Sequence, residues 1–155
     1  MRLSLAFVLT LIAVVAASGS ESASCGAAQY SSDAIARAAN ASCSRVKKGT
    51  AIGANSYPHV YRNSEKIDLK GLRGPFYEWP ILSNGRIYDG GNPGPDRVII
   101  TKDCTPAGVL SHQGAMNNAF RECALKTTSD SPALMAQSRL VLAVYLAMMV
   151  LVFAE

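Results

Sequence analysis

The sequence of 155 residues is poor in the side chains that bind metal ions. It has two histidines and four cysteines, and no two of the cysteines lie at the short spacing that zinc sites use. Neither of its two apolar runs, one near each end, reaches the roughly 20 residues that a membrane-spanning helix requires. The sequence therefore predicts no metal ion or other cofactor, and it disfavours a protein held by a transmembrane helix.

The N-terminal apolar run has the order of a secretory signal peptide. Arg2 precedes an apolar segment over residues 3–15, and small residues follow at 16–19. The alternative, an N-terminal membrane anchor, is disfavoured by the shortness of the run. We expect residues 1–19 to be removed and the remainder to be secreted.

The C-terminal apolar run, residues 140–154, has the arrangement of a signal for a glycosylphosphatidylinositol anchor. Small polar residues at 129–131 and a spacer over 132–139 precede it. As a helix this run would rise only about 22 Å, against a hydrocarbon core of about 30 Å. A short single span and a merely apolar tail remain alternatives. We expect residues 131–155 to be a tail that is replaced by lipid, which would tether the protein to the outer cell surface.

Between these segments, residues 20–130 are expected to form one small monomeric domain with its core at 25–123. Within that core twelve Lys and Arg stand against eight Asp and Glu, which leaves a net charge of +4. A modest positive field attracts a polyanion and weakens with salt, although it also suits a merely soluble surface.

All four cysteines lie in the expected exported domain, where an even number suggests two disulfides. A domain of about 100 residues buries little apolar surface, so such bridges matter for its stability. Three pairings are open, and the sequence by itself does not choose among them. A bridge from Cys25 to Cys123 would close nearly the whole domain and contribute about 4 to 5 kcal/mol in the chain-entropy model.

The pattern of apolar residues predicts one helix followed by strands. Ser31 or Ser32 can cap the helix, and Lys47-Lys48-Gly49 ends it. Its apolar positions, at helical spacing, are Ile35, Ala38, Ala39, Cys43 and Val46. Strands are predicted near residues 56–61, 76–82, 86–88, 97–101 and 109–111, with turn formers between them. A helix against an antiparallel sheet, an α+β fold, is the natural arrangement.

Four side chains on these strand-like segments suit phosphodiester cleavage without a metal ion: His59, Glu78, Arg97 and His112. A base can remove the proton of a ribose 2′-OH, an acid can protonate the leaving 5′-oxygen, and a cation can support the charge on phosphorus. A free Glu titrates at about 4.3 and a free His at about 6.5, so a basic carboxylate and a partly protonated imidazole coexist near neutral pH. This pair predicts a bell-shaped pH profile.

Each of these residues alone has a plainer explanation. A lone histidine is more often an ordinary surface residue, and a lone strand glutamate is usually solvated. The neighbours of Glu78, Tyr77 and Trp79, are expected to be structural, because alternation along a strand points them to the opposite face. The case for a catalytic site depends on the joint occurrence of the four groups.

Taken together, the motifs resemble the small secreted fungal guanyl-preferring ribonucleases, the ribonuclease T-one family. The resemblance spans residues 25–123. It is carried by Asn55-Ser-Tyr-Pro-His59, Tyr77-Glu-Trp-Pro-Ile-Leu82, Gly91-Asn-Pro-Gly-Pro-Asp-Arg-Val98 and His112-Gln-Gly-Ala115, with Asn118, Phe120 and Glu122-Cys123. It implies a long helix packed on a central antiparallel sheet whose concave face holds the active site.

The resemblance also implies roles for the site residues and a substrate, single-stranded RNA. Glu78 would be the general base and His112 the general acid, with His59 beside the base as a cation or assisting base. The phosphate would be contacted by Tyr57, Arg97 and Phe120. The expected reaction cuts on the 3′ side of guanosine, through a 2′,3′-cyclic phosphate to a 3′-phosphate end.

For the guanine base, the resemblance implies a loop directly after the Tyr-Pro-His run. Tyr61 would stack on the base, Glu65 would accept from guanine N1–H and N2–H, and the other contacts would come from Asn63 and Asn118. The sequence departs from the family pattern at Ser64, where a second aromatic usually covers the base, and at Arg62 and Lys66. Losing a stacking face costs about 1 to 3 kcal/mol per base, which predicts a weakened guanine preference unless Arg62 stacks or contacts phosphate instead.

The family resemblance also implies a disulfide between Cys25 and Cys123. Cys43 and Cys104 are additional to the family pattern, and we expect them to pair. The peptide bonds before Pro58 and Pro75 match positions that are cis in the family.

Two other functions remain open. A ribonuclease-like protein can hold RNA or a host protein without cleaving it, but such proteins typically lose a catalytic residue, and here all are present. A ribosome-directed toxin of the related ribotoxin type carries long basic loops, whereas the segments between the motifs here are short. Turnover of naked RNA would separate cleavage from binding, and one discrete ribosomal fragment would indicate the toxin.

Overall fold

The computed structural model describes residues 20–128. The predicted signal peptide, residues 1–19, and the predicted lipid-anchor tail, residues 131–155, lie outside the described residues. Within the described part, no helix is long and apolar enough to cross a membrane. The elements follow one another as β1 (Ser20–Cys25), β2 (Ala28–Tyr30), α1 (Ser32–Lys48), β3 (His59–Tyr61), β4 (Phe76–Pro80), β5 (Asp96–Thr101), β6 (Pro106–Ser111), β7 (Arg121–Glu122) and β8 (Ala124–Thr128).

Helix α1 forms where the sequence predicts it. The Ser31 side chain accepts the Ala34 N–H at 3.2 Å and caps the first turn. At the other end Gly49 takes a left-handed φ of 64°, a conformation that costs glycine little. The helix buries its small apolar face, which includes Ile35, Ala38 and Ala39.

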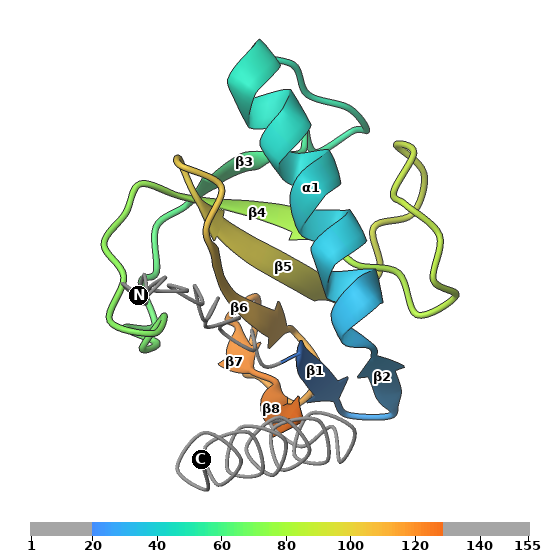
Figure 1. Cartoon of the computed structure of the whole chain (residues 1–155), viewed down its shortest axis with the longest axis vertical. Coiled ribbons are helices and arrows are strands. Elements are labelled where there is room, and N and C mark those ends of the chain that lie inside the picture. The colour runs from blue at the N-terminus through green and yellow to red at the C-terminus, as the bar shows by residue number, and fades with distance from the viewer. Residues whose placement is uncertain (1–19, 129–155) are drawn as a thin grey trace, which may run out of the picture.

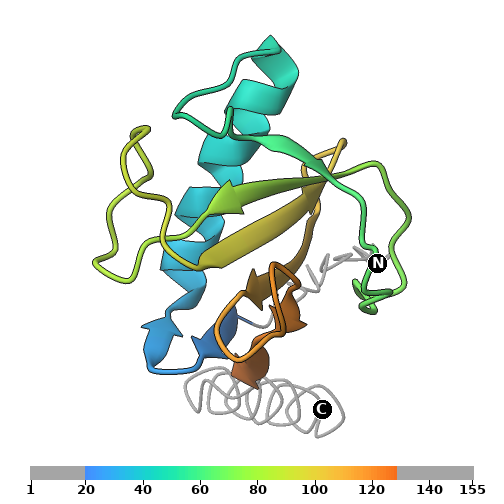
Figure 2. The same cartoon turned by 180° about the vertical axis from the view of Figure 1, so that it is seen from behind.

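The central sheet is antiparallel, in the order β3-β4-β5-β6-β7, and α1 lies across one of its faces (Figure 1). The core between them contains Trp79, Val98, Ile100 and Val109, each at most 1% exposed. Side chains alternate along each strand, so the residues between these point to the opposite face of the sheet. Figure 2 shows the sheet from that side, with α1 behind it. The α+β class is thus confirmed, as is the prediction that Tyr77 and Trp79 point away from the face of Glu78.

A second sheet, in the order β2-β1-β8, joins the two ends of the domain. The sequence did not predict its strands, and the expectation that strands only follow the helix is wrong. The strand β1 reads Ser-Glu-Ser-Ala-Ser-Cys, which has no apolar run and pairs through its backbone with β2 and β8. Such a strand carries almost no signal in hydrophobic patterning.

Two predicted strands differ in the structure. Residues 86–88 make only an isolated bridge, between Ile87 and Ile81, because this segment leaves the sheet for an exposed loop. The strand expected from residue 56 begins at His59, since Ser56 has a left-handed φ of 53° and Pro58 has no N–H to donate. The peptide bonds before Pro58 and Pro75 are cis, as the resemblance implied.

Both predicted disulfides are present. Cys25 pairs with Cys123 and Cys43 pairs with Cys104, at Cα–Cα distances of 4.7 and 5.2 Å. The first joins β1 to the residue before β8, and the second joins α1 to the turn after β5. In the part of the chain that the structure describes, no cluster of three or more His, Cys, Asp or Glu side chains is placed to hold a metal ion.

Candidate active site

The strand register brings the predicted catalytic side chains onto the face opposite α1. His59 in β3 lies opposite Glu78 in β4, which lies opposite Ile99 in β5. Because side chains alternate along a strand, Arg97 shares the face of Ile99 and of Glu78. His112 follows β6 directly. A pocket of about 390 Å³ is lined by these four catalytic candidates and by Asn55, Tyr57, Asn118 and Phe120.

His59 and Glu78 form a short polar contact in this pocket. His59 Nε2 lies 2.5 Å from Glu78 Oε1, and His59 Nδ1 lies 2.9 Å from the Asn55 carbonyl oxygen. A carbonyl oxygen only accepts, so Nδ1–H donates to it, and a second proton lies between Nε2 and the carboxylate. His59 and Glu78 therefore share one hydrogen bond, while the Asn55 carbonyl fixes the other ring nitrogen of His59.

Arg97 is held rigidly beneath the same pocket and is 4% exposed. Its Nη2 donates to the Tyr57 hydroxyl at 2.7 Å, and its Nη1 donates to the carbonyl oxygens of Pro93, Gly94 and Asp96. Its Nε has no hydrogen-bond partner among the described residues and lies 3.7 Å from Glu78 Oε2. Because this Nε is itself buried, the guanidinium acts on the pocket through its charge beside Glu78 and not through an exposed Nε–H donor.

Tyr57 supports this arrangement. Its ring is 3% exposed, stacks on His59 with centroids 4.7 Å apart, and lies under the Arg97 guanidinium. Because the Tyr57 oxygen accepts from Arg97, its own O–H remains available as a donor.

His112 faces the pocket with one free ring nitrogen. Its Nδ1 lies 2.8 Å from the Ala119 carbonyl oxygen and donates to it, which leaves Nε2 for a ligand. The ring stacks on Phe120 with centroids 3.8 Å apart. Phe120 thus fixes the plane of the imidazole, in addition to lining the pocket.

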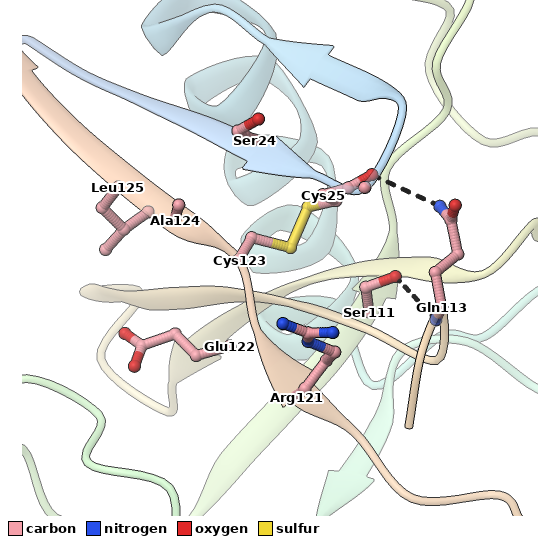
Figure 3. A pocket seen from close by; sticks show the side chains of 10 residues that line it. Ser24, Cys25, Ser111, Gln113, Arg121, Glu122, Cys123, Ala124 and Leu125 are labelled. Atoms are coloured by element: carbon pink, nitrogen blue, oxygen red, sulfur yellow. Dashed lines mark hydrogen bonds between the residues drawn. A yellow bond between two sulfur atoms is a disulfide. The ribbon is translucent and has the colours of Figure 1, made fainter. Parts of the chain in front are cut away.

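The residues on either side of His112 anchor its turn to the small sheet. Figure 3 shows Ser111 and Gln113 in a separate pocket of about 430 Å³, which also contains the Cys25–Cys123 disulfide. The Gln113 backbone N–H donates to Ser111 Oγ at 3.0 Å, and its side-chain amide donates to the Cys25 carbonyl at 3.4 Å. The disulfide-linked ends of the domain therefore hold the position of His112.

Most of the predicted base-binding residues lie at the end of β3 and in the loop that follows it, whereas Asn118 precedes β7. Tyr61 is only 6% exposed, and its ring packs edge-on against Phe120 at 5.6 Å. The Tyr61 hydroxyl donates to Glu65 Oε2 and Asn63 Oδ1, each at 3.2 Å. In this structure the ring contributes to the core below the loop, and Tyr61 also lines a groove outside the catalytic pocket; its stacking on a base stays a prediction.

Glu65 accepts hydrogen bonds where the resemblance expects it to meet guanine. Its Oε1 accepts the Phe120 backbone N–H at 3.0 Å. Burial raises the pKa of this carboxyl, but hydrogen bonds from its own N–H, from Phe120 and from Tyr61, together with the charge of His112, lower the pKa on balance. Burial and the charge of Glu65 in turn raise the pKa of the Tyr61 hydroxyl, which remains a donor.

The other base-binding candidates have different surroundings. The Asn63 amide exchanges two hydrogen bonds of 2.8 Å with the backbone of Ile67, so this side chain shapes the loop. Asn118 lines the catalytic pocket, whereas Arg62 lines a groove outside it. Contacts of these residues with a base stay predictions.

The sequence does not predict two features around the site. The Asn55 carbonyl orients His59, and the only sequence signal is that Asn55 opens the motif ending at His59. Asp96, 1% exposed, accepts the Tyr30 hydroxyl at 2.6 Å and the Gln113 amide at 3.3 Å. A carboxylate at the head of an apolar strand is the signal that could have indicated this buried network.

Known proteins resemble the chain across this domain. A family model described as ribonuclease matches residues 18–124. Guanyl-specific ribonuclease Th1 of Trichoderma harzianum is 50% identical over 103 residues, 66% of this chain and 97% of that protein. Guanyl-specific ribonuclease T1 of Aspergillus oryzae is 46% identical over 99 residues, 64% of this chain and 75% of that protein. Extracellular guanyl-specific ribonuclease Fl1 of Gibberella baccata is 41% identical over 107 residues, 69% of this chain and 100% of that protein.

Proposed function

The chain belongs to the family of fungal guanyl-specific ribonucleases, and from this we infer that it is a metal-independent endoribonuclease that cleaves single-stranded RNA on the 3′ side of guanosine. The roles below are our assignment of that chemistry to individual residues. The observation that carries the assignment is that Glu78, Arg97 and His112 line one pocket, although they come from three different segments.

In the first step the ribose 2′-oxygen attacks the neighbouring phosphorus, and we assign Glu78 as the base that takes the 2′-OH proton. His59, whose Nε2 lies 2.5 Å from Glu78 Oε1, keeps the carboxylate in place. The Asn55 carbonyl fixes the ring of His59 through Nδ1–H. This support from both sides is the preorganisation that a general base requires.

Negative charge then builds on the non-bridging phosphate oxygens. We assign the Arg97 guanidinium charge and the Tyr57 O–H to stabilise this charge. Arg97 is already fixed by carbonyl oxygens and by Tyr57, so little reorganisation is needed when the charge develops. The stacked Phe120 limits access of water to the phosphate from the side of His112.

The P–O5′ bond breaks as Nε2–H of His112 protonates the leaving oxygen, and a 2′,3′-cyclic phosphate remains. In the second step water attacks the cyclic phosphate with the roles reversed, since His112 now accepts the proton of water and Glu78 returns one to the 2′-oxygen. The product is a 3′-phosphate. Guanine is assigned to Glu65, with Asn63 and Asn118 as further contacts.

The test is digestion of defined single-stranded RNAs by the oxidised protein in chelator. We expect cuts after guanosine that leave a cyclic phosphate, and a loss of kcat of at least about 100-fold in both Glu78→Gln and His112→Ala. Intact RNA that is nevertheless bound would indicate the silent binding protein instead. The retained catalytic side chains around the pocket disfavour that alternative.

Export also belongs to this proposal. A relative is named as extracellular, and the order of residues 1–19 suits a signal peptide. We propose that the ribonuclease is secreted and that residues 131–155 are exchanged for a lipid anchor. Release of activity from the producing cells by a phospholipase specific for phosphatidylinositol would support the anchor, whereas activity found only in the medium would contradict it.

A further inference from the structure

A groove outside the catalytic pocket runs along the loop that follows β3. It has a volume of about 640 Å³. Its lining includes Arg62, Asn63 and Lys66 of the loop, together with Gly74, Pro75 and Phe76, where β4 begins. The loop lies at the edge of the central sheet, beyond β3 and β4 (Figure 2).

The groove carries two positive charges that no described acidic residue balances. Arg62 and Lys66 are exposed, and neither side chain has an ion-pair or hydrogen-bond partner among the described residues. Some other exposed cations have partners, namely Arg37 with Asp33, Lys70 with Glu21 and Arg86 with Asp89, whereas Lys47 and Arg73 have none among the described residues. Within the described residues no acidic side chain lines the groove.

The acid nearest in the sequence, Glu65, does not neutralise these charges by pairing with them. Its two carboxylate oxygens accept from the Phe120 N–H and the Tyr61 hydroxyl. Glu65 thus serves the guanine side of the loop, while Arg62 and Lys66 serve the groove. The proposed acceptor for the base, Glu65, and the two cations, Arg62 and Lys66, therefore belong to the same short loop.

Hydrogen bonds within the loop fix the backbone that carries the two cations. The Asn63 amide bridges to the backbone of Ile67 in both directions, and the Lys66 N–H donates to the Asn63 carbonyl at 3.1 Å. Asn63 and Lys66 take left-handed φ values of 51° and 55°, which turn the chain back on itself. A ligand that binds here does not have to order the backbone of the loop, which lowers the entropic cost of binding.

Tyr61 connects the groove to the proposed guanine site. Tyr61 lines the groove, and its hydroxyl donates to Glu65. Two residues earlier in the same strand, His59 lines the pocket proposed for the scissile phosphate. An RNA strand with its scissile phosphate beside His59 and its guanine at Glu65 meets the groove next, in the 5′ direction.

We propose that this groove binds the phosphates on the 5′ side of the cleaved guanosine, through Arg62 and Lys66. The ligand is therefore single-stranded RNA longer than a dinucleotide. This inference rests on the proposed function of the catalytic pocket. It assigns Arg62 to the phosphate backbone and removes it from the contacts with the base.

The test compares substrates that share one cut site. Guanylyl-(3′,5′)-cytidine has no upstream phosphate, and the same dinucleotide preceded by several uridines has them. We expect kcat/KM of the native enzyme to rise with 5′ extension, and the ratio of extended to unextended substrate to fall in Lys66→Gln and in Arg62→Gln. Each phosphate contact with single-stranded RNA makes log affinity fall by about 0.7 per unit of log salt concentration. A fourfold rise in salt concentration should therefore lower the ratio of extended to unextended substrate by about 2.6-fold per contact.

Three controls make the result specific. Lys47→Gln removes the same charge from the exposed end of α1 and should leave the ratio unchanged. Lys66→Arg should restore it. For substrates extended on the 3′ side, kcat/KM should not depend on Arg62 or Lys66. The proposal would be overturned if the two cations affected only 3′-extended substrates. It would also be overturned if the ratio of extended to unextended substrate were the same in the native enzyme and in the variants. If the native enzyme leaves the dinucleotide uncut, the proposed function fails. Fluorescence anisotropy with a labelled uridine oligonucleotide then tests the groove alone. Equal affinity of the native protein and the Lys66→Gln variant for this oligonucleotide would overturn the proposed groove site.

Discussion

Arg97 carries a permanent charge at a position from which water is nearly excluded. Burying an ion is expensive, and the structure offsets the cost with carbonyl oxygens, the Tyr57 hydroxyl and the nearby Glu78 carboxylate. A lysine would retain the charge but has no planar fork with which to reach these acceptors together. The chemistry of the pocket therefore depends on the shape of the guanidinium as well as on its charge.

Replacing Arg97 by lysine should lower kcat by about 100-fold or more, because fixed donors of this kind typically contribute about 2.7 to 4 kcal/mol to the transition state. KM for a guanosine-containing dinucleotide should change much less. Steady-state kinetics measure both values, and circular dichroism checks the fold. Arg86→Lys, on an exposed loop, is the matched control. A kcat within tenfold of native would show that charge alone suffices.

Glu65 should make the stability of the native state depend on pH. The pKa of its carboxyl is lowered in the folded protein, so the ionised form stabilises the fold above the ordinary glutamate pKa and the contribution is lost as pH falls below it. Glu65→Gln should therefore cost about 1 kcal/mol near pH 7, because the Phe120 N–H loses a charged acceptor. The difference in free energy of unfolding between the native protein and the variant should shrink towards pH 3. Urea unfolding over this range measures it, with exposed Glu122→Gln as control; a difference that grew on acidification would contradict the lowered pKa.

At the scale of elements, the active-site face depends on how the small sheet docks on the central one. Asp96, the first residue of β5, accepts the hydroxyl of Tyr30 from β2 and the amide of Gln113, which follows His112. Burial and the neighbouring Asp96 raise the pKa of the Tyr30 hydroxyl, so it stays a donor. One buried carboxylate thus connects the small sheet, the Arg97 strand and the His112 turn.

Tyr30→Phe tests this connection. It removes one donor from a carboxylate that is 1% exposed, and hydrogen bonds to charged groups contribute about 1.5 to 3 kcal/mol. We expect a loss of that size in the free energy of unfolding, measured by urea denaturation. Tyr77→Phe is the matched control, since no hydrogen bond of the Tyr77 hydroxyl is present among the described residues. Equal stability of the two variants would indicate that the Asp96 network does not hold the sheets together.

At the scale of the whole molecule, two disulfides close loops of different length. Cys25 and Cys123 are 98 residues apart, and Cys43 and Cys104 are 61 apart. The two bridges fasten different layers, since the first joins the ends of the domain and the second ties α1 to the turn after β5. Both bridges lie away from the pocket lined by the catalytic candidates.

Loop closure depends only weakly on length, so the chain-entropy model gives about 4.7 kcal/mol for the longer loop and about 4.3 kcal/mol for the shorter. Replacing either pair by alanine should therefore reduce the free energy of unfolding by nearly the same amount, measured in urea. Removing the Cys25–Cys123 pair should in addition lower kcat, because that bridge supports the turn of His112. Loss of activity on removal of the other pair alone would reverse this assignment.

The sequence by itself determined the helix, the class of fold and the identity of the catalytic candidates. Helix α1 follows from local information, the Ser31 cap, the apolar spacing and Gly49. The candidates were visible because their residue types and order match a known family, and the same resemblance supplied the Cys25–Cys123 pairing. Hydrophobic patterning did not reveal β1, since a strand of small polar residues is stabilised by backbone pairing with distant segments.

Only the tertiary structure decided which of these residues meet. The register of β3 on β4 places His59 beside Glu78, and the docking of the two ends of the domain positions His112. It also turned the Tyr61 ring into the core and left Arg62 and Lys66 unpaired along a groove. Whether a side chain is buried, and whether it finds a hydrogen-bond or ion-pair partner, depends on contacts between residues far apart in the chain. No local pattern in the sequence specifies these contacts.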